Sequence, residues 1–222
     1  MNIFFDLDDT LFPSSEFSTL ARKNAINAMI AMGLEKTYED LNSELTDLIS
    51  KKGSNYSRHF DDLCKNLKIK NPQRFIAAAI AAYHDTKTAI QPFPTVPPTL
   101  LKLKKMGFSL YVLTHGNSIK QWDKLIRLKL ALYFDDVFVT DEFGNEKNND
   151  FYLGVLNRLK VSPEDCIMVG DREDSDILTT KALGLKTIRI LSGKYSSSNS
   201  SADFIISDFS KIPELAIKLK KH

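Results

Sequence analysis

The chain has 222 residues, of which 43% are hydrophobic and 26% charged, and its formal net charge is +2 at pH 7. This composition is typical of a soluble globular protein, with room for one domain or one domain with an insertion. The nearly balanced charge indicates neither a nucleic-acid nor a membrane-surface partner, and no apolar run is long enough to span a bilayer. The widely separated Cys64 and Cys166 fit buried thiols in a reducing cytosol. We therefore expect a cytoplasmic protein without a secretion signal.

The first predicted element is a buried strand that runs into an acidic cluster. The apolar run Ile3-Phe4-Phe5 leads directly into Asp6-Leu7-Asp8-Asp9. Side chains two residues apart on a strand point the same way, so Asp6 and Asp8 are expected to face one point. Two carboxylates held that close repel each other unless a proton or a cation intervenes. The stretch fits a magnesium and phosphate site, although a solvated acidic turn is the plain alternative.

Residues 14–91 carry four amphipathic helical patterns joined by short turns. Ser14 or Ser15 can cap the first helix, Gly33 ends it, and Thr37 precedes the second. Four such helices predict a small all-α bundle. We place this inserted cap domain at residues 14–91.

The remaining chain predicts an α/β core at residues 1–13 and 92–222. The proline-rich segment 92–98 is interpreted as a stiff linker because proline does not fit a helix interior. From Thr99 onward helices alternate with strands, which are expected at residues 108–113, 137–139, 166–169 and 187–190, with an edge strand at 203–206. This alternation predicts a Rossmann-like parallel sheet with helices on both faces, and the first strand belongs to it.

Polar groups follow the predicted strands at four places, and in open α/β sheets ligands bind beyond the carboxyl ends of strands. The four places are Asp6 with Asp8, Thr114-His115-Gly116-Asn117, Lys147, and Gly170-Asp171 with Asp174 and Asp176. Each has a plain alternative as an ordinary turn, a solvated lysine or an acidic helix start. Together they supply carboxylates for a cation, donors for phosphate oxygens and a balancing lysine, which are the parts that phosphoryl transfer needs.

These motifs resemble those of the haloacid dehalogenase superfamily of phosphohydrolases. The resemblance rests on DLDDTL at 6–11, LTHGN at 113–117, a lone lysine at 147 and VGDREDSD at 169–176, and it covers essentially the whole chain. The helical insertion after the first motif matches the bundle-type cap of that superfamily. Within it, the chain looks most like small archaeal magnesium-dependent phosphatases, a group that includes glyceraldehyde 3-phosphate phosphatases.

The resemblance implies roles for the first and second motifs. Asp6 would be the nucleophile that becomes an aspartyl-phosphate, and Asp8 would protonate the leaving alcohol and later activate water. Thr114 would bind the phosphoryl group, helped by backbone amides near His115 and Gly116.

The resemblance also implies a Mg²⁺ site and a charge-balancing lysine. Lys147 would steady Asp6 and the phosphate. Asp171 would hold Mg²⁺ together with Asp6 and the backbone carbonyl of Asp8. Asp176 would support either the metal or Lys147.

Two departures from the superfamily pattern stand out. Asn148 takes the place of the proline that usually follows the lysine, and His115 stands where asparagine or aspartate is common. Asp8 argues against the dehalogenase and phosphonatase branches, which do not use an acid at that position.

The resemblance implies a phosphatase for small sugar or triose phosphates, such as glyceraldehyde 3-phosphate, because a small cap leaves little room for a macromolecule. A nucleotidase, a β-phosphoglucomutase-like phosphotransferase, a receiver-like signalling domain and a non-catalytic binding module are the alternatives. The chain could be a monomer or a homodimer. Arg58 and His59, in a donor-rich turn at 53–59, are candidates for substrate specificity.

Overall fold

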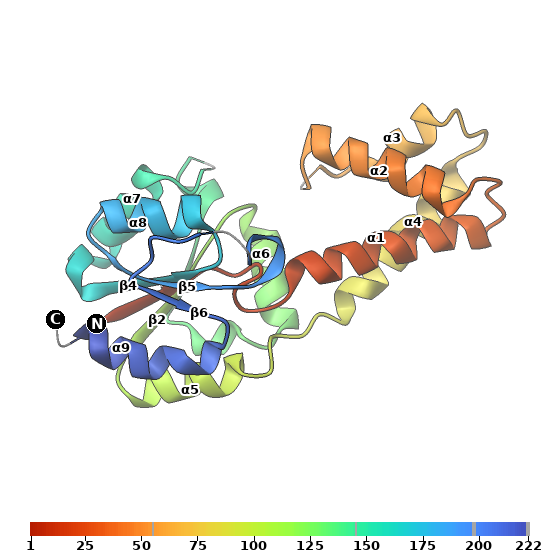
Figure 1. The fold of residues 1–222 in the computed structure, drawn as a ribbon. Coiled ribbons are helices and arrows are strands. Elements are labelled where there is room, and N and C mark those ends of the chain that lie inside the picture. The colour runs from red at the N-terminus through yellow and green to blue at the C-terminus, as the bar shows by residue number, and fades with distance from the viewer. Residues whose placement is uncertain (55, 145, 197–198, 221–222) are drawn as a thin grey trace. The chain divides into compact units, whose positions relative to one another are not determined.

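The computed structural model describes residues 1–54, 56–144, 146–196 and 199–220. The chain forms two compact units (Figure 1). Met1–Ser15 and Gln91–His222 form one, here called the core unit, and Glu16–Ile90 form the other, called the helical unit.

A sheet of six parallel strands organises the core unit, in the order β3-β2-β1-β4-β5-β6. Its strands are β1 (Asn2–Phe5), β2 (Ser109–Thr114), β3 (Asp136–Val139), β4 (Cys166–Gly170), β5 (Lys186–Ile190) and β6 (Phe204–Ile206). β4 is buried along its whole length, as expected for a strand covered on both faces. The predicted Rossmann-like parallel sheet is confirmed, and β6 is an edge strand.

Helices cover both faces of this sheet (Figure 1). In the core unit they are α5 (Val96–Lys105), α6 (Ser118–Arg127), α7 (Asn149–Leu159), α8 (Thr179–Ala182) and α9 (Ile212–Lys220). α5 and α9 lie side by side on one face, and α7 and α8 lie on the other. Beneath α7, the buried Phe151 and Val155 pack with Phe4 of β1 and Phe138 of β3.

Short helical turns connect these elements. Five are 3₁₀ turns, η1 (Ala131–Tyr133), η2 (Thr140–Glu142), η3 (Pro163–Asp165), η5 (Gly193–Tyr195) and η6 (Phe209–Lys211), and the sixth, η4 (Glu173–Leu178), is a π-helical turn.

Three details of the predicted elements are wrong. The proline-rich segment is not all linker, because α5 already includes Pro97 and Pro98, which fit a first helical turn where no backbone donor is needed. Thr114 is the last residue of β2 rather than the residue after it. The single helix expected through Ile177 is divided into η4 and α8.

The helical unit has its own apolar core. It contains most of α1 (Ser14–Ala31) together with α2 (Tyr38–Lys52), α3 (His59–Asn66) and α4 (Gln73–Thr88). Side chains from all four helices are buried together, among them Met29, Leu45, Leu63 and Phe75. Thr37 precedes α2 as predicted, and its side chain caps that helix by accepting from the Asp40 amide at 3.1 Å.

The start of α1 is capped differently from the sequence prediction. The carboxylate of Asp9, not a side chain of Ser14 or Ser15, accepts a hydrogen bond from the Ser15 amide at 2.9 Å. Asp9 itself has a left-handed backbone with φ of +56°. One acidic residue of the first motif therefore serves as a helix cap.

Both cysteines are free and buried, as predicted. In the described part of the chain, no helix has the length and apolar character needed to cross a membrane.

Candidate functional site

The predicted site residues of the core unit lie at one edge of the sheet. β1 is hydrogen-bonded between β2 and β4, so the chain leaves three adjacent strands at Asp6, Thr114 and Asp171. The strand order reverses at this place, since β2 lies on one side of β1 and β4 on the other. Open α/β sheets bind ligands at such switch points, beyond the carboxyl ends of the strands.

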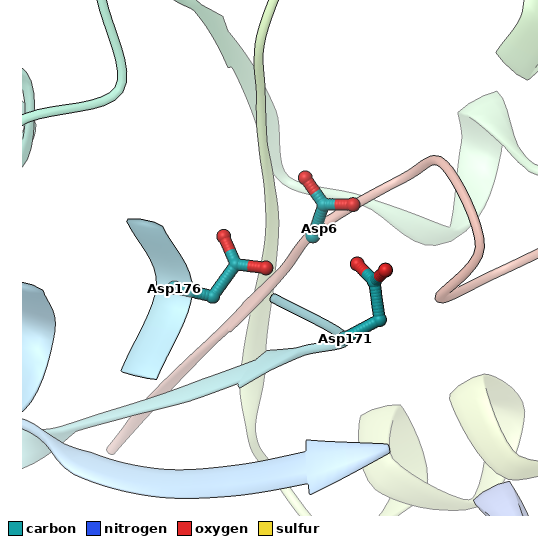
Figure 2. Close-up of side chains that lie close together, drawn as sticks. All are labelled: Asp6, Asp171 and Asp176. Atoms are coloured by element: carbon teal, nitrogen blue, oxygen red, sulfur yellow. The ribbon is translucent and has the colours of Figure 1, made fainter. Parts of the chain in front are cut away.

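Three buried carboxylates converge at this edge. Asp6, Asp171 and Asp176 each offer an oxygen, and these oxygens all lie within 4.8 Å of one another. Figure 2 shows the three side chains arranged around one shared space, with Asp6 after β1, Asp171 after β4 and Asp176 on η4. All three residues are buried, which is unusual for aspartate.

Lys147 joins two of these carboxylates. Its Nζ lies 2.5 Å from Asp6 Oδ1 and 2.6 Å from Asp176 Oδ1, and the lysine side chain is itself buried. Burial alone would lower the pKa of Lys147, but Asp176 and Asp6 raise that pKa well above its ordinary value. The lysine is therefore a permanent cation at this edge of the sheet.

Burial and mutual repulsion raise the pKa values of the other carboxyl groups. The pKa of Asp6 rises to about 7, chiefly through burial, although Lys147 opposes the rise. The pKa of Asp171 rises to about 8, again through burial first and then through Asp6 and Asp176. Both groups are therefore poised to take up a proton or a cation near neutral pH.

The residues fit a divalent metal ion. When all three carboxylates are ionised, they and one lysine leave two surplus negative charges, three minus one, in a buried place. The residue Asp171 is 3% exposed, and its carboxylate accepts no hydrogen bond from the described residues, which leaves its oxygens available to a cation. Oxygen ligands of this kind suit hard cations such as Mg²⁺.

Gly170 and the π-helical turn explain how Asp176 reaches the cluster. A Cβ on Gly170 would lie 2.6 Å from Cβ and Cγ of Asp176, so only glycine allows this approach. The Asp176 Oδ2 accepts from the Arg172 amide at 3.1 Å, which closes the turn around the carboxylate. Single π-helical turns are frequent at functional sites.

Asp8 does not join the carboxylate cluster through its side chain. Both of its oxygens accept hydrogen bonds from Lys124 Nζ on α6, at 2.7 and 2.6 Å. The Asp8 side chain is 36% exposed, whereas Asp6 is buried. The sequence analysis missed Lys124, because a single lysine within a helix gives no motif, and its partly buried position beside Asp8 follows only from the fold.

Two buried polar residues, Thr140 and Gln121, hold the turn of the second motif, Thr114-His115-Gly116-Asn117. Thr114 is buried at the end of β2, and the Gly116 amide donates to Thr140 Oγ1 at 3.1 Å. Gln121 Nε2 donates to the His115 carbonyl at 2.5 Å. Gly116 needs its small size, because its φ is +129° and a Cβ there would lie 2.7 Å from Gln121 Nε2.

The sequence analysis did not select Thr140 as a site residue, although a polar residue directly after a strand such as β3 can indicate a site at the edge of the sheet. Its hydroxyl also lies 3.2 Å from His115 Nδ1. Burial, with Lys147 and Arg172 nearby, lowers the pKa of His115, so the exposed imidazole is neutral at neutral pH. The Gly116 amide, which was expected to donate to a phosphate oxygen, donates to the Thr140 hydroxyl in this structure.

The two specificity candidates lie in the helical unit, where α2 ends and α3 begins; Asn55 of this turn is outside the described residues. Arg58 is exposed, with Nη2 4.0 Å from Asp61 Oδ1. His59 packs edge-on against Tyr56, with the ring centroids 5.2 Å apart. Burial lowers the pKa of His59, and its buried Nε2 has no hydrogen-bond partner among the described residues.

Known proteins resemble the chain along its length. A family model for haloacid dehalogenase-like hydrolases matches residues 3–190. A glyceraldehyde 3-phosphate phosphatase from Methanopyrus kandleri is 44% identical over 93% of this chain and 91% of its own length. Its counterpart from Methanocaldococcus jannaschii is 43% identical over 99% of this chain and 98% of its own length.

The fold is also similar to that of solved haloacid dehalogenase-like proteins. The crystal structure of a haloacid dehalogenase-like family hydrolase from Xanthomonas campestris matches with a TM-score of 0.72 and 18% identity, covering 100% of this chain and 92% of that one. At that identity, the match shows the fold alone. The family match over residues 3–190 and the relatives above 40% identity go further: the chain belongs to the haloacid dehalogenase-like hydrolase family and is a phosphatase of that family.

Proposed function

We propose that this phosphatase hydrolyses small phosphorylated metabolites, with glyceraldehyde 3-phosphate as the leading substrate, through a phosphorylated Asp6 and with Mg²⁺. The observation that carries the proposal is Lys147, which bridges Asp6 and Asp176 within a buried cluster of three carboxylates. Such a site suits phosphoryl transfer, whose catalysis consists mainly of positioning and charge neutralisation.

Asp6 and Asp8 carry the covalent steps. An Asp6 carboxylate oxygen attacks phosphorus, the bond from phosphorus to the ester oxygen breaks, and Asp8 gives its proton to the leaving alcohol. Asp8 then takes a proton from a water molecule that attacks phosphorus. Phosphate leaves and the Asp6 carboxylate is restored. In the structure Asp8 is paired with Lys124, so for this step the Asp8 side chain would have to leave that pair, take up a proton and turn toward the ester oxygen.

Thr114, Lys147 and the turn at His115 and Gly116 bind the phosphoryl oxygens. Support comes from their position: Thr114 ends β2 beside β1, and Lys147 already contacts Asp6. Two hydrogen bonds hold the turn in shape. The Thr140 hydroxyl accepts from the Gly116 amide, and the Gln121 side chain donates to the His115 carbonyl. A preformed turn lowers the reorganisation needed when phosphate binds.

Asp6 and Asp171 would hold Mg²⁺ directly, together with the backbone carbonyl of Asp8. Asp176 would not bind the ion itself but would hold Lys147 in place, because its oxygens already accept from Lys147 and the Arg172 amide. When bound, the ion supplies positive charge that neutralises the phosphoryl group. Magnesium is preferred over calcium, since few carboxylates plus phosphate and water suit octahedral Mg²⁺ better than larger Ca²⁺.

The substrate assignment rests on the relatives at 44% and 43% identity, which are named for glyceraldehyde 3-phosphate. Cytoplasmic location belongs to the same proposal and is supported by two buried free thiols, which are typical of a reducing compartment. The family match argues against the receiver-like alternative. A monomer or a homodimer would serve this chemistry equally well.

A substrate panel tests the function. Purified protein is given triose, sugar and nucleotide phosphates with Mg²⁺, and released phosphate is measured. We expect the highest kcat/KM for glyceraldehyde 3-phosphate, no release in excess chelator, and none by Asp6→Asn. Preference for a nucleotide would favour the nucleotidase alternative. Turnover of a hexose phosphate only in the presence of a sugar bisphosphate would favour the phosphotransferase.

A further inference from the structure

An arginine lies fully buried inside the sheet. Arg189 is on β5 between the apolar residues Ile188 and Ile190, and its side chain has no exposed surface. Burying a charge is costly, and an apolar residue of similar size would often give equal or greater stability. The contacts of Arg189 must therefore explain its presence.

Those contacts reach the loop that carries the carboxylate cluster. Arg189 Nε donates to the backbone carbonyl of Asp171 at 3.1 Å, and Nη1 donates to Glu173 Oε2 at 2.9 Å. The register of the sheet causes this proximity, because Arg189 pairs with Gly170, the last residue of β4. The guanidinium thus lies where the chain leaves β4 toward Asp171.

The same guanidinium holds the segment that follows β5. Nη2 donates to the Tyr195 carbonyl at 2.9 Å, and Nη1 donates to the Asn199 carbonyl at 2.8 Å. Glu173 reinforces this link, since its Oε1 accepts from the Ser201 amide and hydroxyl, both at 2.8 Å. One ion pair, between the buried Arg189 and the partly exposed Glu173, therefore ties two loops together at this edge of the sheet.

We propose that Arg189, paired with Glu173, is a positioning residue for the metal-binding carboxylate of Asp171. This inference rests on the proposed function, in which Asp171 holds Mg²⁺. The Asp171 carboxylate accepts no hydrogen bond from the described residues, so its direction is set by its backbone. Arg189 holds that backbone through the Asp171 carbonyl and through Glu173 two residues later. Without it, Asp171 loses its alignment with Asp6.

The fork of donors on arginine matters as well as its charge. Among the described residues, Arg189 serves at least four acceptors with three nitrogens, spread over two loops. A lysine offers one compact ammonium and cannot reach all of them. Arg189→Lys should therefore keep the charge but lose most of the alignment.

The test compares Mg²⁺ binding by Arg189→Lys, Arg189→Met and Glu173→Gln with that of the wild-type protein. Titration calorimetry with MgCl₂ gives the Kd, and the Mg²⁺-induced shift in Tm gives a second readout, both measured where each variant is folded. We expect the Kd for Mg²⁺ to rise about 10- to 100-fold, the range seen when groups that orient metal ligands are removed. At saturating Mg²⁺, kcat should return to within about threefold of the wild-type value.

Asp203→Asn is the matched control. Asp203 ties the other end of β5, because it accepts from the Thr187 amide at 2.8 Å, from its hydroxyl at 2.9 Å and from Lys181 at 2.8 Å. This variant should lower Tm without changing the Kd for Mg²⁺. A purely structural Arg189 would behave in the same way.

The outcomes separate the inference from the function on which it rests. Folded Arg189 or Glu173 variants that bind Mg²⁺ as tightly as the wild type would overturn the positioning role. If neither Arg189 variant folds, Glu173→Gln decides the matter by the same criterion. Failure of the wild-type protein itself to bind Mg²⁺ would instead overturn the proposed metal site.

Discussion

The Nζ of Lys147 lies 2.5 Å from Asp6 Oδ1, and both side chains are buried at the carboxyl end of β1. The same ammonium reaches Asp176 at 2.6 Å. In the proposed mechanism, a lysine in this position would both orient the attacking carboxylate and offset negative charge on the phosphoryl group. Its loss would leave the Asp176 carboxylate buried without a cation.

Lys147→Met should therefore cost both activity and stability. We expect kcat/KM to fall by about 10²-fold or more, since removing one preorganised donor commonly has an effect of that size. Breaking a buried ion pair should also lower the free energy of unfolding of the metal-free protein by about 3 kcal/mol. Steady-state kinetics and urea unfolding check the two effects.

Lys104→Met is the matched control for this prediction. Lys104 pairs with Asp135 at 2.6 Å, but both side chains are more than one third exposed. The same substitution there should leave activity unchanged and alter the free energy of unfolding by less than about 1 kcal/mol. Equal effects at the two positions would contradict the role of Lys147.

The stability of the metal-free protein should fall as pH rises from about 4 to about 8. The folded-state pKa values of Asp6 and Asp171, about 7 and about 8, lie above the ordinary value of 3.8. The folded state therefore binds more protons than the unfolded state across that window, and raising the pH favours unfolding.

At the proposed site, bound Mg²⁺ would replace those protons, so its effect on stability should have the opposite dependence on pH. The increase in Tm caused by Mg²⁺, relative to chelator, should be small near about pH 5.5 and large near about pH 8.5. Comparing samples with and without Mg²⁺ at each pH removes the contributions of other titrating groups. A constant increase across this range would exclude competition between Mg²⁺ and protons at the cluster.

Asp8→Ala should harm substrates with poor leaving groups most. A general acid contributes about 10² to 10⁴-fold, but an aryl phosphate with an acidic phenol needs little protonation. We expect a large loss of kcat with glyceraldehyde 3-phosphate and a much smaller loss with an aryl phosphate. Lys124→Met is the control, because it removes the partner of Asp8 but keeps the acid. Equal losses of the Asp8 variant on both substrates would remove Asp8 from this role.

The sequence predicted the parts of the site that follow strand ends. Asp6 and Asp171 each belong to a short motif and Lys147 is a lone lysine in a loop after β3, and the topology of a parallel sheet brings such strand ends and loops together. The contact between Asp8 and Lys124, 116 residues apart, has no local pattern. Arg189 was placed inside an apolar strand, but only the register of β5 against β4 reveals its acceptors. Packing between distant elements was the part that sequence patterns could not supply.

Arg58 and His59 remain the candidates for substrate specificity, since in the proposed mechanism the groups around Asp6 would contact only the phosphoryl group. Arg58→Ala and His59→Ala should change the order of kcat/KM across a metabolite panel. Turnover of an aryl phosphate should stay within about twofold of the wild-type value. Arg74→Ala, which removes another exposed arginine of the helical unit, is the control. An unchanged order in both variants would exclude this turn as the specificity element.

The identity of the phosphorylated residue tests the proposed mechanism most directly. Asp8→Asn lacks the base that activates water, so an aryl phosphate should phosphorylate this variant faster than the product is hydrolysed. The reaction is quenched in acid after one turnover, and mass spectrometry of the peptides locates the phosphoryl group. We expect it on Asp6, and none in the variant that also carries Asp6→Asn. A phosphoryl group on another residue, or phosphate release by a protein with Asp6→Asn, would contradict Asp6 as the nucleophile.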